Sequence, residues 1–165
     1  GEKSVAAPTA GLHLTEETLS RSRELGVKVA KIELSVGIGT FKPITSESIK
    51  EHVMHDESYE ISEGVWGICQ EAKRVVAVGT TVVRALESAA ATGKLAGRTD
   101  LFIAPGFEFK VVNALMTNFH LPRSSLLVMI EAFAGKRWKE LYTLAIDEGY
   151  RFLSFGDAMF IERSK

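Results

Sequence analysis

Two histidines lie in polar segments of the sequence where an imidazole could transfer protons. His13 closes residues 9–13 (TAGLH), and His120 lies within residues 117–122 (TNFHLP), between a predicted strand and a predicted helix. Because imidazole titrates near neutral pH, either ring suits general acid or base catalysis. For each histidine, a purely structural hydrogen bond is the alternative.

A second candidate site is the segment Gly79, Thr80 and Thr81, which follows an apolar run and begins a predicted helix. Free backbone N–H groups and two hydroxyls at a helix start could bind an anion or a ribose. The alternative is that Thr80 only caps the helix and that Gly79 only allows close packing.

Residues 37–40 (GIGT) form a weaker candidate for ligand binding through Gly37, Gly39 and Thr40. They match only part of a dinucleotide-binding fingerprint, because the third glycine is lacking. A tight turn is the alternative.

Charged and aromatic residues near these loops could complete a site. Glu87 and Asp100 are the carboxylates expected there, with surface ion pairs as the alternative. Basic residues that could face phosphates are Lys42, Arg74, Arg98, Lys110, Arg123 and Arg151, with Arg84 one turn beyond Thr80. Aromatic residues that could stack on bases, or pack in the core instead, are Phe41, Phe107, Phe109 and Phe119.

Metal binding is not expected from this sequence. His52 and His55 lie three residues apart beside Asp56 and Glu57, which could present ligands on one helical face. Because no third ligand or supporting residue can be identified, we interpret the pair as solvated surface.

Composition narrows the class of protein further. The single cysteine, Cys69, allows no intrachain disulfide and fits a reducing cytoplasm. The longest apolar run, residues 125–133, contains Glu131 and falls well short of the ~20 residues that cross a bilayer. A net charge of -1 gives no general attraction to phosphate, so RNA binding would need a local basic patch. We expect a cytoplasmic monomer without membrane contact.

Hydrophobic periodicity predicts alternating helices and strands. The predicted helices run from Thr15 to Gly26, from Ser62 to Ala72, from Thr80 to Gly93, and over 124–134 and 138–146. The predicted strands cover 27–36, 74–78, 101–103, 109–116 and 158–161.

This order predicts a single α/β domain over residues 1–165. Its sheet should be mixed but largely parallel, covered by helices on both faces, as a three-layer or incomplete barrel-like fold. Ligands of such sheets bind beyond the carboxyl ends of the strands. The loops at Gly37, Gly79, Pro105 and Asn118 are therefore the expected binding places.

Several segments together resemble the S-adenosylmethionine:tRNA ribosyltransferase-isomerase family, and the resemblance spans nearly the whole chain in order. The segments are 4–13 (SVAAPTAGLH), 36–43 (VGIGTFKP), 77–81 (AVGTT), 99–103 (TDLFI), 113–122 (NALMTNFHLP), 150–152 (YRF) and 154–159 (SFGDAM). The resemblance implies that the chain is part of a catalytic domain, without the N-terminal segment and inserted β domain of the family.

The resemblance implies queuosine biosynthesis: the ribosyl group of S-adenosylmethionine is transferred to 7-aminomethyl-7-deazaguanine at the tRNA wobble position and isomerised. Epoxyqueuosine, adenine and methionine are the products, so S-adenosylmethionine is a consumed co-substrate, and no metal is needed.

The resemblance also suggests a role for each candidate residue. Proton transfer falls to His13 and His120, and ribose hydroxyl binding or base catalysis to Glu87. Substrate binding falls to Gly37, Gly39, Thr40, Gly79, Thr80, Thr81, Asp100 and Asn118. RNA phosphate contacts fall to Lys42, Arg84, Lys110 and Arg123.

Two other functions remain open at this point. A non-catalytic RNA-binding fragment would keep the fold, although the retained polar loops argue against it. An S-adenosylmethionine-dependent methyltransferase would favour a fuller glycine fingerprint than the two incomplete sets found here.

Overall fold

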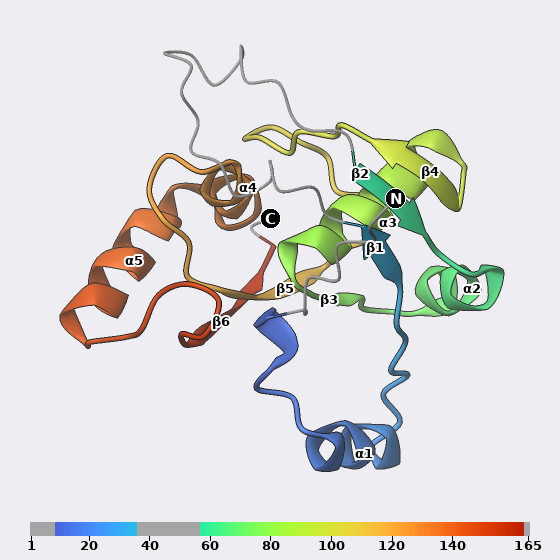
Figure 1. The fold of residues 1–165 in the computed structure, drawn as a ribbon, viewed down its shortest axis with the longest axis horizontal. Helices are drawn as coiled ribbons and strands as arrows, with labels where there is room; N and C mark the ends of the chain where they lie inside the picture. Colours follow the sequence, from blue (N-terminus) through green and yellow to red (C-terminus); the bar gives the residue numbers. More distant parts are fainter. Residues whose placement is uncertain (1–8, 36–56, 164–165) are drawn as a thin grey trace.

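The computed structural model describes residues 9–35 and 57–163 (Figure 1). Hydroxyl side chains cap the N-termini of three of its helices. Thr15, Ser62 and Ser124 each accept a hydrogen bond from the backbone N–H three residues ahead, at the starts of α1 (Glu16–Glu24), α2 (Glu63–Glu71) and α4 (Ser125–Ala134). Each cap satisfies a donor that has no partner within its helix. These three helix starts are confirmed.

Glycines bound the central helix α3 (Thr80–Thr92). Gly79 precedes it with φ of 102°, and Gly93 ends it in the left-handed region with φ of 71°. Both conformations favour glycine, because a Cβ atom would be strained there. The other helices in residues 9–35 and 57–163 are α5 (Trp138–Asp147) and the 3-10 helices η1 (Thr9–Gly11) and η4 (Gly135–Arg137).

The described strands form two sheets. The first is mixed and has the order β3-β5-β6, with β3 (Val76–Val78), β5 (Ala114–Asn118) and β6 (Ala158–Glu162). β3 is parallel to β5, whereas β6 is antiparallel to it. Ala77, Leu115 and Ile161 lie side by side across the three strands and are buried. They form the sheet side of the hydrophobic core.

The second sheet is antiparallel and has the order β1-β2-β4, with β1 (Glu33–Ser35), β2 (Glu57–Glu60) and β4 (Ala96–Thr99). The register pairs Leu34 with Tyr59, and Tyr59 in turn with Gly97. Helix α3 packs against strands of both sheets, so it is the element that the two sheets share.

Helices α3 and α4 cover the buried side of the mixed sheet. Ile130 and Phe133 of α4 are fully buried in the same cluster as Leu115. A second aromatic group holds α5 against the end of β5, since the ring of Tyr142 meets the rings of Phe119 and Phe152 at 5.5 and 5.7 Å.

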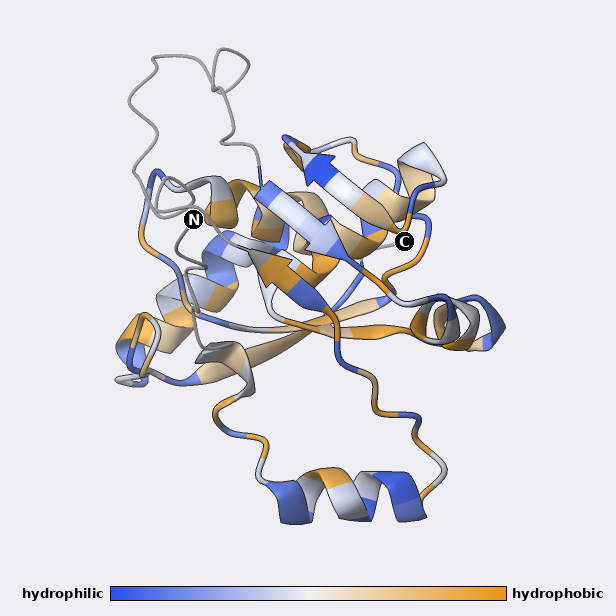
Figure 2. Cartoon of the chain, turned by 45° about the vertical axis from the view of Figure 1, so that its right-hand side comes forward, coloured by the Kyte–Doolittle hydropathy of each residue, from blue (hydrophilic) through white to orange (hydrophobic). Residues whose placement is uncertain are grey.

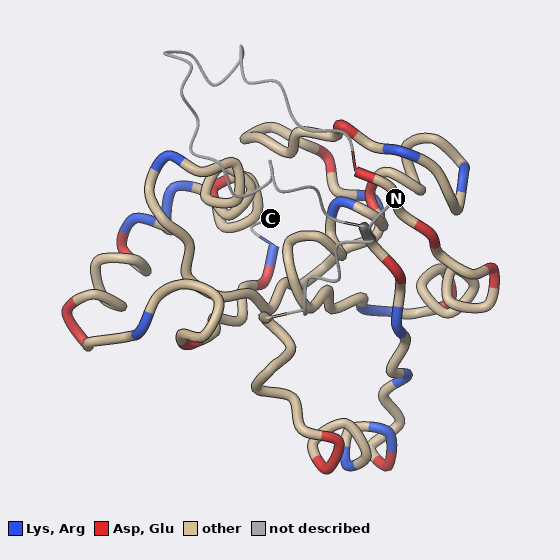
Figure 3. Tube along the Cα trace, viewed as in Figure 1, with Lys and Arg blue, Asp and Glu red and all other residues tan. Residues whose placement is uncertain are grey.

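Helix α1 stands apart from this core. Figures 1 and 2 show it at the end of two extended connections, and none of its residues is buried. Acidic side chains begin it and basic side chains lie in its last turn, which complements the helix dipole (Figure 3). It therefore contributes little to the packing of the domain.

The strand predictions were less accurate than the helix predictions. In the described part of the predicted strand 27–36, which is residues 27–35, only Glu33–Ser35 pairs as a strand, and no strand forms at 101–103. β2 and β4 were missed, and the strand predicted at 109–116 begins at Ala114. The AGRT sequence of β4 contains one β-branched residue, so its strand character comes from pairing with β2.

The α/β class and the mixed sheet are confirmed. The balance of pairings differs from the expectation, because β3 and β5 form the one parallel pair among the described strands. Within the described ranges, no helix is long and apolar enough to cross a membrane.

Candidate active site

A cleft of about 360 Å³ opens beside the first turn of α3. Because β3 and β5 are parallel, the residues that follow them meet at one edge of the sheet. Five residues predicted from the sequence line this cleft: Gly79, Thr80, Thr81, Asn118 and His120. The loop at Pro105, which was also expected at a binding edge, does not line it.

The start of α3 supplies polar groups to the cleft. The N–H of Gly79 donates to the carbonyl of Met116 at 2.8 Å, which extends the β3–β5 pairing to the edge of the cleft. Thr80 and Thr81 then line the cleft as the first helical residues. The arrangement suits a ribose hydroxyl or a carboxylate, because the first N–H groups of a helix have no acceptor within it.

Asn118 connects three segments around the cleft. Its Oδ1 accepts a hydrogen bond from the Thr9 hydroxyl at 3.2 Å, and its Nδ2 donates to the Asp157 carbonyl at 3.3 Å. Both ends of the amide therefore have protein partners, and η1 and the segment before β6 are held against β5. The predicted contact of Asn118 with substrate stays a prediction.

His120 is the one acid–base side chain among the described residues that line the cleft. Burial lowers the pKa of His120 to about 4, so its imidazole is neutral at pH 7. The Nε2 atom lies 3.0 Å from the Thr117 hydroxyl, and the backbone N–H of His120 donates to the Tyr142 hydroxyl at 3.0 Å. These contacts fix the ring in a cavity where a neutral base could act.

His13 lies outside the cleft and is exposed. Its Nε2 atom is 2.9 Å from the carbonyl oxygen of Gly156, so in the tautomer that carries the Nε2 proton it donates to that loop. The structure thus brings His13 to the loop beside the cleft, but not to the lining that contains His120.

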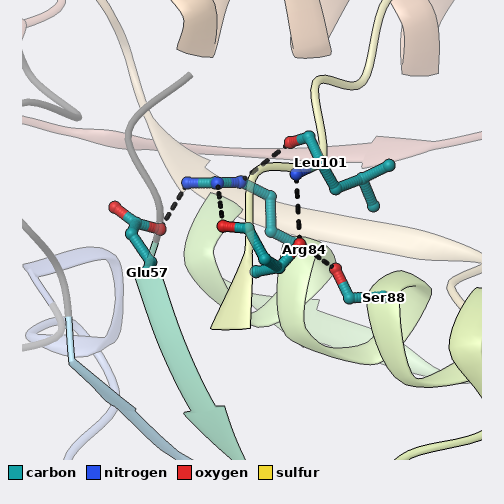
Figure 4. A network of polar contacts seen from close by, with 5 residues as sticks. Glu57, Arg84, Ser88 and Leu101 are labelled. Carbon is teal, nitrogen blue, oxygen red and sulfur yellow. Dashed lines mark hydrogen bonds and ion pairs between the residues drawn. The ribbon is translucent and has the colours of Figure 1, made fainter. Parts of the chain in front are cut away.

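Arg84 is buried, and Figure 4 shows its guanidinium between Glu57 and the backbone at Leu101. Its guanidinium pairs with the buried Glu57 and donates to the carbonyls of Leu101 and Thr99 at 3.1 and 3.4 Å. The residue is 1% exposed, and burial lowers its pKa while Glu57 opposes that effect. These contacts indicate a structural role for Arg84, and its predicted contact with RNA phosphate stays a prediction.

Glu87 is also buried and fully engaged by the backbone. Its Oε1 accepts from the N–H groups of Val111 and Val112 at 3.0 and 2.9 Å, and its Oε2 accepts from that of Lys110 at 2.8 Å. It is 1% exposed and does not line the cleft. These contacts give Glu87 a structural role, because they fix the segment before β5. The predicted role in ribose binding or base catalysis stays a prediction.

The remaining predicted residues either do not line the cleft or lie outside the described residues. Asp100 and Lys110 are exposed and do not line the cleft. Arg123 is exposed between two lining residues and has a positive φ of 57°. Outside the described residues lie Gly37, Gly39, Thr40, Phe41, Lys42, His52 and His55.

Of the phenylalanines considered for base stacking, those the structure describes pack inward. Phe109 and Phe119 are buried, and the ring of Phe107 contacts that of Phe109 at 5.0 Å. Core packing, the alternative stated for them, is therefore their role here.

No site role was predicted for Ile32, Leu34, Ser124, Leu153 or Ser154, which also line the cleft. Ile32 and Leu34 come from the strand region before residue 36, and Ser124 was predicted only as a helix start. Leu153 and Ser154 precede β6, where Gly156 and Asp157 are the signal of a turn.

Comparison with known proteins identifies a family to which this chain is similar over most of its length. The model of the queuosine biosynthesis protein family matches residues 1–161. The S-adenosylmethionine:tRNA ribosyltransferase-isomerase of Carboxydothermus hydrogenoformans is 53% identical over 166 residues, and that of Thermotoga petrophila is 51% identical over 168. The alignments cover 96% and 97% of this chain, but 49% and 50% of the relatives.

A solved structure agrees with these relatives. The crystal structure of S-adenosylmethionine tRNA ribosyltransferase from Thermotoga maritima matches with a TM-score of 0.77 and 44% sequence identity. The match covers 92% of this chain and 51% of that chain. The chain thus spans about half the length of the proteins it matches.

Proposed function

The chain belongs to the queuosine biosynthesis protein family, and from that premise we propose that it is part of the catalytic domain of an S-adenosylmethionine:tRNA ribosyltransferase-isomerase. The proposed reaction transfers and isomerises the ribosyl group of S-adenosylmethionine onto 7-aminomethyl-7-deazaguanine in tRNA. Epoxyqueuosine, adenine and methionine are the proposed products, and the cytoplasm, where tRNA is modified, is the proposed place.

One observation carries this proposal. Thr9, Gly79–Thr81 and Asn118–His120 belong to three separate family-like segments, and residues from all three line a single cleft. Convergence of distant polar segments at strand ends is the arrangement that α/β domains use for ligand sites.

The lining of the cleft suits a nucleoside with a charged sulfur. Its volume of about 360 Å³ is within the ~300–1,000 Å³ typical of small-molecule pockets. Hydroxyls of Thr80 and Thr81 could bind ribose or carboxylate oxygens. Apolar side chains such as Ile32 and Leu126 offer a surface for a base or a methionine side chain.

The chemistry of the substrate defines what the protein must supply. The sulfonium of S-adenosylmethionine makes the ribose 5′ hydrogens more acidic, so a base near that carbon can start the rearrangement. An acid that protonates adenine assists its departure.

His120 is the residue we assign to proton transfer in the cleft. Its low pKa keeps the ring neutral at pH 7, so one nitrogen carries a lone pair that can accept a proton. In the tautomer whose Nε2–H donates to Thr117, that nitrogen is Nδ1. His13, which lies at the adjoining loop, is the second candidate for proton transfer.

Release of free adenine tests the proposal. The chain is incubated with S-adenosylmethionine labelled in the adenine ring and with tRNA that carries 7-aminomethyl-7-deazaguanine, and free adenine is quantified. We expect adenine release that depends on this tRNA, with equal amounts of adenine and methionine formed. A matched tRNA with guanine at the modified position is the control and should give no release.

The other outcomes assign the other functions. Methylated RNA without free adenine would indicate a methyltransferase. RNA binding with neither product would indicate a non-catalytic RNA-binding fragment, and either result would overturn the proposal for this chain.

A further inference from the structure

Phe155 is the most exposed large apolar residue among those that the structure describes, with 85% of its surface open to solvent. It lies in the segment 151–157 that leads into β6. A fully exposed phenylalanine forgoes about 2 kcal/mol of hydrophobic stabilisation that burial would give. Single exposed apolar residues are common on protein surfaces, so what distinguishes Phe155 is the turn that holds it and its place beside the cleft.

The segment that carries Phe155 is held firmly. The N–H of Gly156 donates to the Leu153 carbonyl at 2.9 Å, and the N–H of Asp157 donates to the Arg151 carbonyl at 2.8 Å. A Cβ atom on Gly156 would lie 2.2 Å from the Arg151 carbonyl oxygen, so the turn closes too tightly for any other residue. The ring is thus presented on a preorganised turn.

The same turn adjoins the cleft. Leu153 and Ser154, the two residues before Phe155, line the cleft, and the N–H of Leu153 donates to the Phe119 carbonyl at 2.9 Å. On the other side, the Gly156 carbonyl contacts His13 and the Asp157 carbonyl contacts Asn118. Phe155 is therefore attached to the frame of the cleft at both ends.

Charge near the ring favours stacking over phosphate binding. Arg151 and Asp157 form an ion pair with two atoms 3.0 Å apart, and Asp157 also accepts from the Arg151 backbone N–H at 2.7 Å. The pairing lowers the pKa of Asp157, so the carboxylate stays charged at neutral pH and neutralises the one guanidinium of the turn. The turn then offers an uncharged aromatic face rather than a cation.

We propose that Phe155 is a stacking platform for an unpaired nucleobase of the RNA substrate at the rim of the cleft. The inference rests on the proposed function, from which the RNA partner comes, and adds a contact residue for it. An aromatic side chain binds bases through their flat faces whatever their sequence, and unpaired bases are the ones it can reach.

Direct RNA binding tests this contact separately from catalysis. Fluorescence anisotropy measures the affinity of the chain for a labelled tRNA stem-loop, with a blunt duplex of the same stem as the RNA without unpaired bases. Phe155→Leu keeps an apolar side chain but removes the ring, and Phe155→Trp keeps a ring. Phe160→Leu is the matched control, because Phe160 is also exposed, at 55%, but lies on β6 outside the cleft lining.

We expect Phe155→Leu to weaken stem-loop binding by about 5-fold to 100-fold. Phe155→Trp and Phe160→Leu should bind within about 2-fold of the unmodified chain, and affinity for the blunt duplex should not respond to any of these changes. Unchanged thermal unfolding of Phe155→Leu confirms that the fold is intact, as expected for an exposed residue.

Three results would overturn the proposal. Equal stem-loop affinity of Phe155→Leu and the unmodified chain would exclude stacking, as would absence of RNA binding by the chain. A change in sedimentation with Phe155→Leu, without a change in RNA affinity, would assign the ring to self-association. Failure of adenine release with a Phe155-dependent affinity would instead remove the proposed catalysis and leave the stacking contact in place.

Discussion

The first turn of α3 and the two turns that follow it use polar residues in opposite ways. Thr80 and Thr81 face a cleft with room for a ligand, whereas Arg84 and Glu87 are buried with protein partners for their charged groups. The difference shows that a charged residue near a binding loop is not thereby part of the site. A charged residue whose donors and acceptors all have protein partners stabilises the fold, whereas one that lacks such partners can bind a ligand or take part in catalysis.

The largest effect is expected from a change at Arg84, one of the two buried residues of this comparison. Arg84→Ala removes the cation beside buried Glu57, and loss of one partner of a buried ion pair costs about 3–5 kcal/mol. We expect a loss of that size in the free energy of unfolding, measured by urea denaturation.

An exposed pair provides the control for this variant. Lys28 and Glu71 are 3.4 Å apart with both side chains mostly exposed, so Glu71→Gln should cost less than about 1 kcal/mol. An equal loss of unfolding free energy in Arg84→Ala and Glu71→Gln would show that the buried pair of Arg84 and Glu57 does not stabilise the fold.

Variants of Glu87 distinguish a structural role of this carboxylate from a catalytic one. Glu87→Ala leaves three backbone N–H groups without their acceptor, and we expect a loss of about 3 kcal/mol in unfolding free energy. Glu87→Gln keeps one acceptor oxygen and should lose about half as much. A Glu87→Ala variant with unaltered urea denaturation but no adenine release would support the catalytic assignment.

A substitution at His120 tests the residues that line the cleft. His120→Ala should lower single-turnover adenine release by about 100-fold if this ring transfers a proton, with little change in RNA affinity. His13→Ala, outside the cleft lining, is the matched variant and should be affected less. Equal rates for His120→Ala and the unmodified chain would exclude His120 as the proton-transfer group.

The buried imidazole of His120 also makes the stability of the fold depend on pH. The unfolded chain binds the proton near pH 6.5, whereas the folded chain binds it near pH 4. Between these values the unfolded state holds more protons, so the folded state has its full stability above about pH 6.5 and loses about 3 kcal/mol as the pH is lowered to 4.

His120→Gln isolates this effect from other titrating groups. The difference in unfolding free energy between the unmodified chain and His120→Gln, followed by urea denaturation from pH 7 to pH 4, should shrink across that window. A difference that is constant with pH would contradict the burial of a neutral imidazole.

The sequence predicted helices and cleft-lining residues better than it predicted strands and side-chain directions. Capping residues and periodicity are local signals, so Thr15, Ser62 and Ser124 marked helix starts correctly. Strands such as β4 depend on a partner distant in sequence, and their own residues carry a weak signal.

Arg84 illustrates why the site could be predicted only in part. Its place one turn after Thr80 fixes the helix face, but not what covers that face. Since β2 and β4 cover it, an apparent surface cation became a buried one. Gly79, Thr80 and Asn118 were easier to place, because strand ends determine their position without knowledge of the opposite sheet.

The isolation of α1 has a consequence for its dynamics. A helix of nine residues is shorter than the ~12–15 residues at which isolated helices become even marginally stable in water, and no residue of α1 is buried to compensate. Its amide hydrogens should therefore exchange with deuterated solvent far sooner than those of α3 and α4, whose residues are buried in the core.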